Sequence, residues 1–102
     1  MISQNTTVSL SRQDIRILKD QLYQLRPCVV INGSGLDTWA VQNIDMALES
    51  NELIKIRTHA SNRDELLKIA NEICSSLKAT LIQVVGYIIA IYRKNPELEE
   101  IQ

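Results

Sequence analysis

The most constraining feature of the chain is a pair of apolar, strand-like segments near its end. Residues 80–85 and 88–92 are separated only by Gly86 and Tyr87. A parallel pair of strands needs a crossover of a dozen or more residues, whereas an antiparallel pair can be joined by two. The sequence therefore predicts a β-hairpin, and the rest of the chain must supply the elements that extend and cover it.

The first half of the chain begins with one helix and one strand. Residues 11–25 carry isoleucine and leucine at helical spacing behind a Ser-x-x-Asp capping pattern that opens at Ser11. Pro27 ends this helix. Residues 28–31 are a short run of cysteine, valine and isoleucine, which is typical of a strand covered on both faces.

The middle of the chain repeats the alternation. Asp37 is suited to be the N-cap of a second helix, and Ser61 or Asn62 that of a third. Between these helices, residues 53–58 alternate so that Ile54 and Ile56 would face the core, and the basic side chains between and after them would face away. The pattern predicts a half-exposed strand.

Together these segments predict an α/β fold with the order α-β-α-β-α-β-β and a four-stranded mixed sheet. We expect a largely parallel sheet closed by one antiparallel strand, with the first helix packed on the face opposite the other two. Residues 1–10 lack periodicity and form an expected flexible lead-in, residues 11–94 the domain, and residues 95–102 an acidic tail. A chain of 102 residues fits one such domain.

Composition argues against several function classes. No apolar run approaches the length of a membrane span, and the first residues lack the pattern of an export signal, so we expect a cytoplasmic protein. Cys28 and Cys74 are expected to be buried small apolar residues, and with His59 as the only histidine the chain lacks the donors for a zinc site. We expect neither enzymatic activity nor a cofactor, a metal or a small-molecule substrate.

The loop of residues 32–35 is the first candidate binding feature. It reads Asn32, Gly33, Ser34 and Gly35, and it lies between a predicted strand and a predicted helix. Two glycines let the backbone approach a ligand, and the following helix N-terminus favours an anion. Such a loop could clamp a phosphate, although two glycines at such a position are also ordinary turn chemistry.

Basic side chains form two further candidates. Lys55 and Arg57 lie on one face of a predicted strand, and a row on one side of the first helix begins at Arg12 and continues with Arg16 and Lys19. Each row is either a track for a phosphate backbone or a solvated face. The formal net charge of −1 argues mildly against nucleic-acid binding, although three of the 12 acidic residues lie in the last six positions.

Trp39 is the only tryptophan. If the second helix begins at Asp37, the Trp39 side chain points away from the apolar stripe of that helix and lies exposed beside the glycine loop. There it could stack on an unpaired base. The alternative is that it packs on the first turn of its own helix or on a neighbouring helix.

Three segments, PCVVINGSGLD, IDMALESNELIKIR and LIQVVGYIIAIYR, together resemble the CRM domain, a family named for chloroplast RNA splicing and ribosome maturation. The resemblance covers residues 11–93 and is strongest with the stand-alone bacterial YhbY-like members. It implies a fold similar to the C-terminal domain of bacterial translation initiation factor three. It also implies RNA binding without catalysis, in precursors of the large ribosomal subunit.

The family's GxxG loop, compared with that of KH domains, corresponds here to residues 32–35, and Lys55 and Arg93 match positions that are usually basic. The chain departs from the family where Asn32 replaces the first loop glycine and Asp37 a common threonine. Tyr87 also stands where a basic or polar residue is frequent. Gly33, in addition, stands where many plant relatives have lysine, and all four changes are expected to weaken phosphate binding.

We therefore predict an RNA-binding factor in large-subunit assembly, which contacts ribosomal RNA and has ribosomal proteins as possible neighbours. The alternative is a protein-interaction module on the ribosome or an assembly factor, without direct RNA contact. The predicted RNA-binding residues are the loop, the two basic rows, Arg93 and Trp39.

Overall fold

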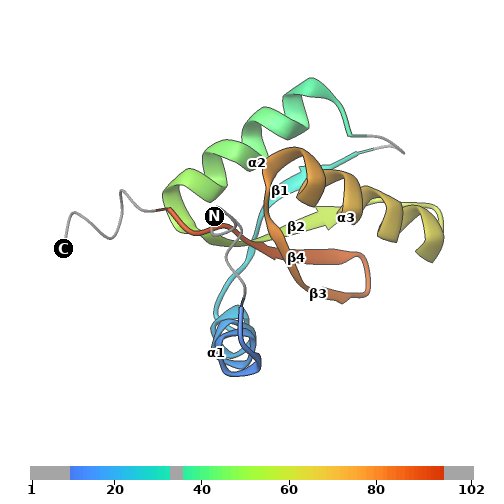
Figure 1. Cartoon of the computed structure of the whole chain (residues 1–102). Helices are drawn as coiled ribbons and strands as arrows, with labels where there is room; N and C mark the ends of the chain where they lie inside the picture. The colour runs from blue at the N-terminus through green and yellow to red at the C-terminus, as the bar shows by residue number, and fades with distance from the viewer. Residues whose placement is uncertain (1–9, 33–35, 96–102) are drawn as a thin grey trace, which may run out of the picture.

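A computed structural model describes residues 10–32 and 36–95 of the chain. Within these residues the predicted order of elements is confirmed: three helices and a four-stranded mixed sheet (Figure 1). The helices and strands, in chain order, are α1 (Arg12–Leu22), β1 (Pro27–Ile31), α2 (Thr38–Asn51), β2 (Leu53–Thr58), α3 (Arg63–Leu77), β3 (Thr80–Val85) and β4 (Ile88–Tyr92).

The expected caps hold all three helices at their N-termini. Ser11 and Asp14 form a reciprocal capping box at α1, with bonds of 3.0 and 3.1 Å. The Asp37 carboxylate accepts from the Ala40 amide at 2.8 Å and caps α2. Of the two candidates for α3, the cap is Asn62. Each cap satisfies a backbone N–H that has no partner inside its helix.

The strand order is β1-β2-β4-β3. Strand β1 pairs parallel with β2, while β4 is antiparallel to both of its neighbours, β2 and β3. The predicted hairpin is present, with Gly86 at a φ of +60° as the first residue of its two-residue turn. One strand, β4, runs antiparallel to the other three, as expected, but the expectation that it would close the sheet at an edge was wrong, because the hairpin folds β4 back inside the sheet and leaves β3 at the edge.

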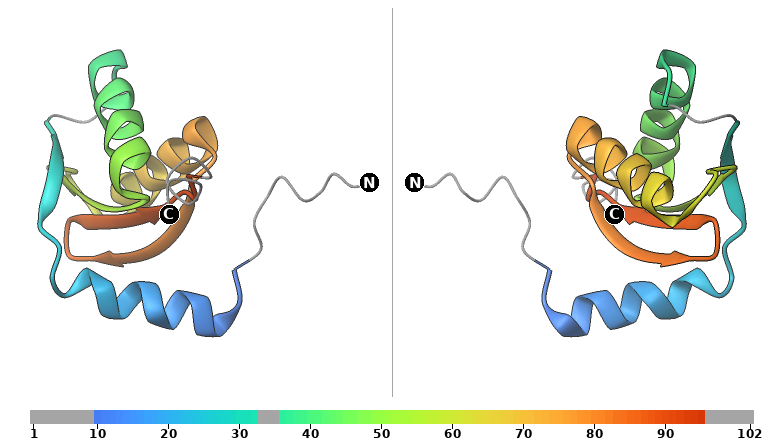
Figure 2. Two further views of the ribbon diagram at one scale, coloured as in Figure 1. Left: turned by 90° about the vertical axis from the view of Figure 1, so that its left-hand side faces the viewer. Right: turned by 90° about the vertical axis from the view of Figure 1, so that its right-hand side faces the viewer.

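The helices divide between the two faces of the sheet, as predicted. Helices α2 and α3 cover one face, and α1 crosses the other (Figure 2). The larger core lies under α2 and α3 and includes Ile44, Ile56 and Ile89, which are fully buried. The smaller core lies under α1, where Leu22 packs with Leu53, Ile82 and Ala90.

Strand β1 is not covered on both faces, and that expectation was wrong. Val29 and Ile31 face the larger core, but Val30 is exposed and so is Cys28. The reason is that β1 is an edge strand, whereas α1 packs on β2 and β3. A short apolar run does not reveal from sequence alone whether a helix will reach its second face.

The cysteines also differ from expectation. Cys28 is exposed and Cys74 is only half-buried. The Cys28 thiol lies 3.7 Å from the carbonyl oxygen of Lys55 and donates to it. Partial desolvation nevertheless raises the pKa of both thiols, which disfavours the reactive thiolate at neutral pH.

Candidate nucleic-acid interface

One flank of α1 carries the predicted basic row. The side chains of Arg12, Arg16 and Lys19 are exposed, and among the described residues none forms an ion pair with them. Together with Ile15, Asp20 and Tyr23 of the same helix region and Gln83 of β3, they line a groove of about 440 Å³. We call this the α1 groove. It is positive, because its three cations outnumber the single carboxylate.

A second exposed feature lies on the same face of the sheet as α1, in the part that the helix does not cover. Arg57 of β2 lies opposite Val30 of β1 and Ile88 of β4, and Ile88 lies opposite Val85 of β3. Residues directly opposite each other share a face, so these four side chains form one row across all four strands. We call it the open row. Val85 is 60% exposed, and Arg57 has no ion-pair partner among the described residues.

The α1 groove and the open row are neighbours on one side of the sheet. Gln83 is in the groove, and Val85, two residues further along β3, points to the same face. One wall of the groove is therefore next to the open row along β3. Four cations therefore lie on this side of the sheet: Arg12, Arg16 and Lys19 line the groove together with the carboxylate of Asp20, and Arg57 belongs to the open row.

Lys55 shares the sheet face of Arg57, as predicted, but its ammonium group is used inside the protein. Its Nζ donates to the carbonyl oxygen of Leu25 at 3.0 Å, and the side chain is half-buried. This bond ties the segment after α1 to the centre of the sheet. Lys55 therefore positions α1, and this bond uses one of the three N–H donors of its ammonium group.

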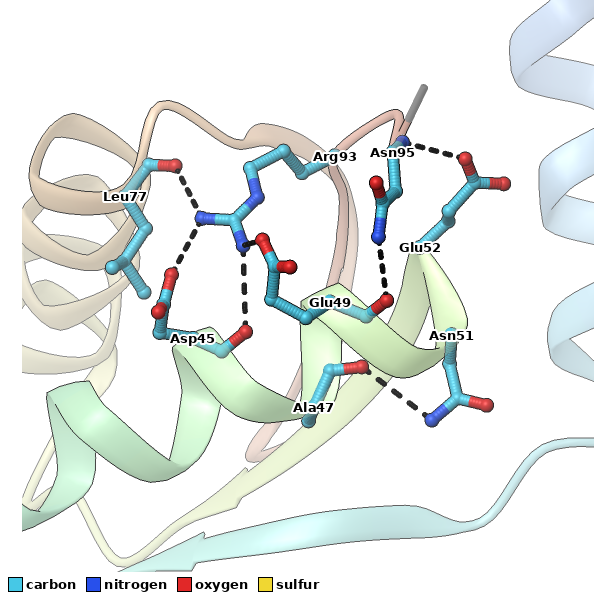
Figure 3. A network of polar contacts seen from close by, with 8 residues as sticks. All are labelled: Asp45, Ala47, Glu49, Asn51, Glu52, Leu77, Arg93 and Asn95. Atoms are coloured by element: carbon cyan, nitrogen blue, oxygen red, sulfur yellow. Dashed lines mark hydrogen bonds and ion pairs between the residues drawn. The ribbon is translucent and has the colours of Figure 1, made fainter. Parts of the chain in front are cut away.

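Arg93 lies elsewhere, in a network at the C-terminal ends of α2 and α3 (Figure 3). One guanidinium nitrogen donates to the Asp45 carboxylate at 2.8 Å and to the carbonyl oxygen of Leu77 at 3.1 Å. The other donates to the Glu49 carboxylate at 3.2 Å. Only 20% of the side chain is exposed, so most of its charge is compensated within the protein.

The same network holds a strained residue. Glu52 is the C-cap of α2 and has a φ of 61°, a backbone conformation that non-glycine residues rarely adopt. Its carbonyl oxygen accepts from the Arg93 amide at 2.9 Å, and its carboxylate accepts from the Asn95 amide at 2.6 Å. The Asn95 side chain in turn donates to the Glu49 carbonyl oxygen at 2.7 Å (Figure 3). The tight turn from α2 into β2 is therefore held by hydrogen bonds to the segment that follows β4.

The glycine loop falls largely outside the described residues. Of its four positions only Asn32 is described, as an exposed residue directly after β1, while Gly33, Ser34 and Gly35 are not. Asn32 lies at the end of the sheet where Arg57 is found, because Ile31 pairs with Thr58. Asn32 is therefore at the same end of the sheet as the open row.

Trp39 is 59% exposed, as one of its two alternatives predicted. It belongs to the first turn of α2, on the opposite side of the sheet from α1 (Figure 2). The capping bond places the Asp37 carboxylate at the same helix end. A helix N-terminus favours a bound anion, but here the Asp37 carboxylate already takes that position.

A larger groove, of about 800 Å³, lies between α2 and α3. Its charged lining residues are Asp64, Glu72 and Lys68, so acids outnumber bases, and Leu36 and Leu67 make part of it apolar. Size alone would favour this groove, but its charge does not suit a phosphate backbone. Among the described residues there is also no group of three or more acidic, histidine or cysteine side chains that could hold a metal ion.

The basic rows on α1 and β2 were thus predicted from the sequence, but the places of Tyr23 and Gln83 on this surface were not. Tyr23 continues the spacing of Arg12, Arg16 and Lys19, and this signal was available in the sequence. Gln83 could not be found this way, because its place beside α1 depends on how the helix crosses the sheet.

Comparison with known proteins identifies relatives over nearly the whole chain. The CRS1/YhbY (CRM) domain matches residues 10–93. A protein of Haemophilus influenzae named as RNA-binding is 33% identical over 89 residues, which cover 87% of this chain and 90% of the relative. A probable RNA-binding protein of Pseudomonas aeruginosa is 27% identical over 90 residues, which cover 88% of this chain and 86% of the relative.

A similar fold is found among solved structures. The solution structure of a hypothetical Staphylococcus aureus protein, described as a candidate for RNA binding, superimposes with a TM-score of 0.76 at 29% identity. It covers 85% of this chain and 91% of its own. Of the helices in the described ranges, none has the length and apolarity that crossing a membrane requires.

The placement of Arg93 predicts a role in stability. Replacing it with alanine (Arg93→Ala) removes a mostly buried guanidinium together with the hydrogen bonds that it donates. The free energy of unfolding should therefore fall by about 2 kcal/mol. The ion pairs add little to this, because both carboxylates are about half exposed. Urea denaturation measures the effect. The matched control, Arg57→Ala, should stay within about 0.5 kcal/mol of the original protein, and equal losses in the two variants would refute the assignment.

Proposed function

Because the chain belongs to the CRS1/YhbY (CRM) domain family, we propose that it binds RNA through the α1 groove and the open row. The observation that carries this proposal is the gathering of four cations without described partners on one side of a protein whose net charge is −1. Phosphate contacts by lysine and arginine supply most of the affinity for nucleic acids. The names of the relatives support the same ligand class.

The finer proposal is that the RNA is ribosomal RNA in precursors of the large ribosomal subunit, in the cytoplasm. It rests on the resemblance to the YhbY-like members. The loop at Asn32 extends the surface in this proposal, because it follows β1 at the end of the sheet where Arg57 lies. Ribosomal proteins are proposed neighbours at the same site.

A second candidate function is favoured by one observation. The open row contains three apolar side chains, Val30, Ile88 and Val85, beside a single charge, and exposed Tyr87 follows in the hairpin turn. Exposed apolar surface of this kind is often a protein contact. A role on a protein surface of the ribosome would need no RNA affinity in a purified system, and the RNA-binding measurements below separate the two functions.

The basic flank of α1 gives the first test. A double variant, Arg16→Ala with Lys19→Ala, should bind a labelled single-stranded oligoribonucleotide roughly tenfold or more weakly at moderate salt. The slope of log affinity against log salt should fall by about 0.7 for each phosphate that the variant no longer neutralises. Fluorescence anisotropy over a salt series measures both quantities.

The matched control removes two cations from α3 instead, as Arg63→Ala with Lys68→Ala. It changes the net charge equally on the opposite side of the sheet and should leave the affinity and the salt slope nearly unchanged. Equal losses in the two double variants would mean that only the total charge matters, and the assigned surface would be wrong. If the purified protein binds no RNA at all, the protein-contact function takes the place of this proposal.

The loop has its own test at Asp37. Asparagine caps a helix about as well as aspartate, so Asp37→Asn removes a negative charge while keeping α2 intact. If the loop holds a phosphate, affinity for RNA should rise roughly fivefold, the effect of about 1 kcal/mol for one like charge a few ångströms away. Asp64→Asn, which removes the same charge from the first turn of α3, should change little. Unchanged affinity in Asp37→Asn would exclude the loop from the interface.

A further inference from the structure

The α1 groove contains an aromatic side chain that the fold does not use. Tyr23 is the C-cap of α1, and 88% of it is exposed. Stabilisation by an apolar side chain scales with the area that it buries, so Tyr23 contributes little to either core. Its backbone is still helical, with φ −60° and ψ −25°, and its ring therefore stays in line with the basic row.

The spacing along α1 places cations beside this ring. Lys19 is four residues before Tyr23 and Arg16 is seven, so all three lie on the same flank of the helix. Four residues advance about 6 Å along a helix axis. A planar group stacked on Tyr23 would therefore have an ammonium or guanidinium group within reach of any phosphate attached to it.

The opposite wall of the groove offers a hydrogen-bonding group. Gln83 of β3 lines the groove and is half-exposed, and no described residue forms a hydrogen bond with its side-chain amide. A carboxamide both donates and accepts, so it can pair with the edge of a nucleobase. Stacking surface, base-edge partner and cations are thus present in one groove.

We infer that the α1 groove takes an unpaired nucleotide, with its base stacked on Tyr23, its edge bonded to Gln83 and its phosphates near Lys19 and Arg16. This inference rests on the proposed function and deepens it, because it names single-stranded RNA as the ligand class. In a duplex the faces of the bases are stacked on each other, and an A-form helix presents phosphates, 2′-hydroxyls and base edges to a side chain, but not base faces. Only an unpaired base can present its face to Tyr23.

The test compares two probes and two variants. The probes are a labelled single-stranded oligoribonucleotide of mixed sequence and a fully paired RNA duplex of the same composition, and anisotropy measures binding to each. Tyr23→Ala should weaken binding of the single strand by at least about fivefold, the lower end of what one stacked base contributes. Tyr23→Phe keeps the aromatic face and should bind like the original protein. The original protein should bind the duplex more weakly than the single strand, and both variants should bind the duplex as the original protein does.

The outcomes separate this inference from the proposed function. If the original protein binds neither probe, RNA binding itself fails. If it binds RNA but Tyr23→Ala holds the single strand as tightly as before, RNA binding stands and the stacking site is overturned. A stronger affinity for the duplex than for the single strand would overturn the ligand class.

Discussion

Packing of α1 against the second face of the sheet is the interaction on which the proposed surface depends. Leu22 is buried against Leu53, Ile82 and Ala90, and the Lys55 ammonium fixes the segment that follows the helix. This small core covers only part of the sheet. One flank of the helix is thereby held beside Gln83, and the open row stays uncovered. A helix that covered the whole face would leave neither a groove nor a row.

The distribution of charge matters more here than the total. Two cations that the family resemblance singled out, Lys55 and Arg93, bond within the protein and stabilise its architecture. The cations on α1 and Arg57 have no described partners and form the proposed interface. Asp37, in contrast, places a negative charge at the N-terminus of α2, shortly after residues 32–35 in the chain. The surface beside α1 is therefore the stronger candidate for phosphate contacts.

Most of the fold could be predicted from the sequence, because caps, periodicity and a two-residue hairpin are local signals. The opposed placement of α1 followed from strands with apolar residues on both faces. The exposure of Cys28 and the interior position of β4 could not be predicted, since both depend on strand order. For the site, spacing identified the rows on α1 and β2, but the partners of Lys55 and Arg93 lie 30 and 48 residues away in sequence. Distant partners of this kind decide whether a cation faces solvent or stabilises the core.

The proposed RNA surface is tested most directly by titrating the isotopically labelled protein with a single-stranded oligoribonucleotide and following the backbone amide signals by nuclear magnetic resonance. If RNA binds the proposed surface, the largest shifts should fall on one side of the sheet, from Arg16 and Lys19 across Gln83 to Arg57. Signals from the groove between α2 and α3, such as those of Lys68 and Asn71, should hardly move. If the largest shifts instead appear in that groove, RNA binds the other side of the sheet and the central claim is wrong.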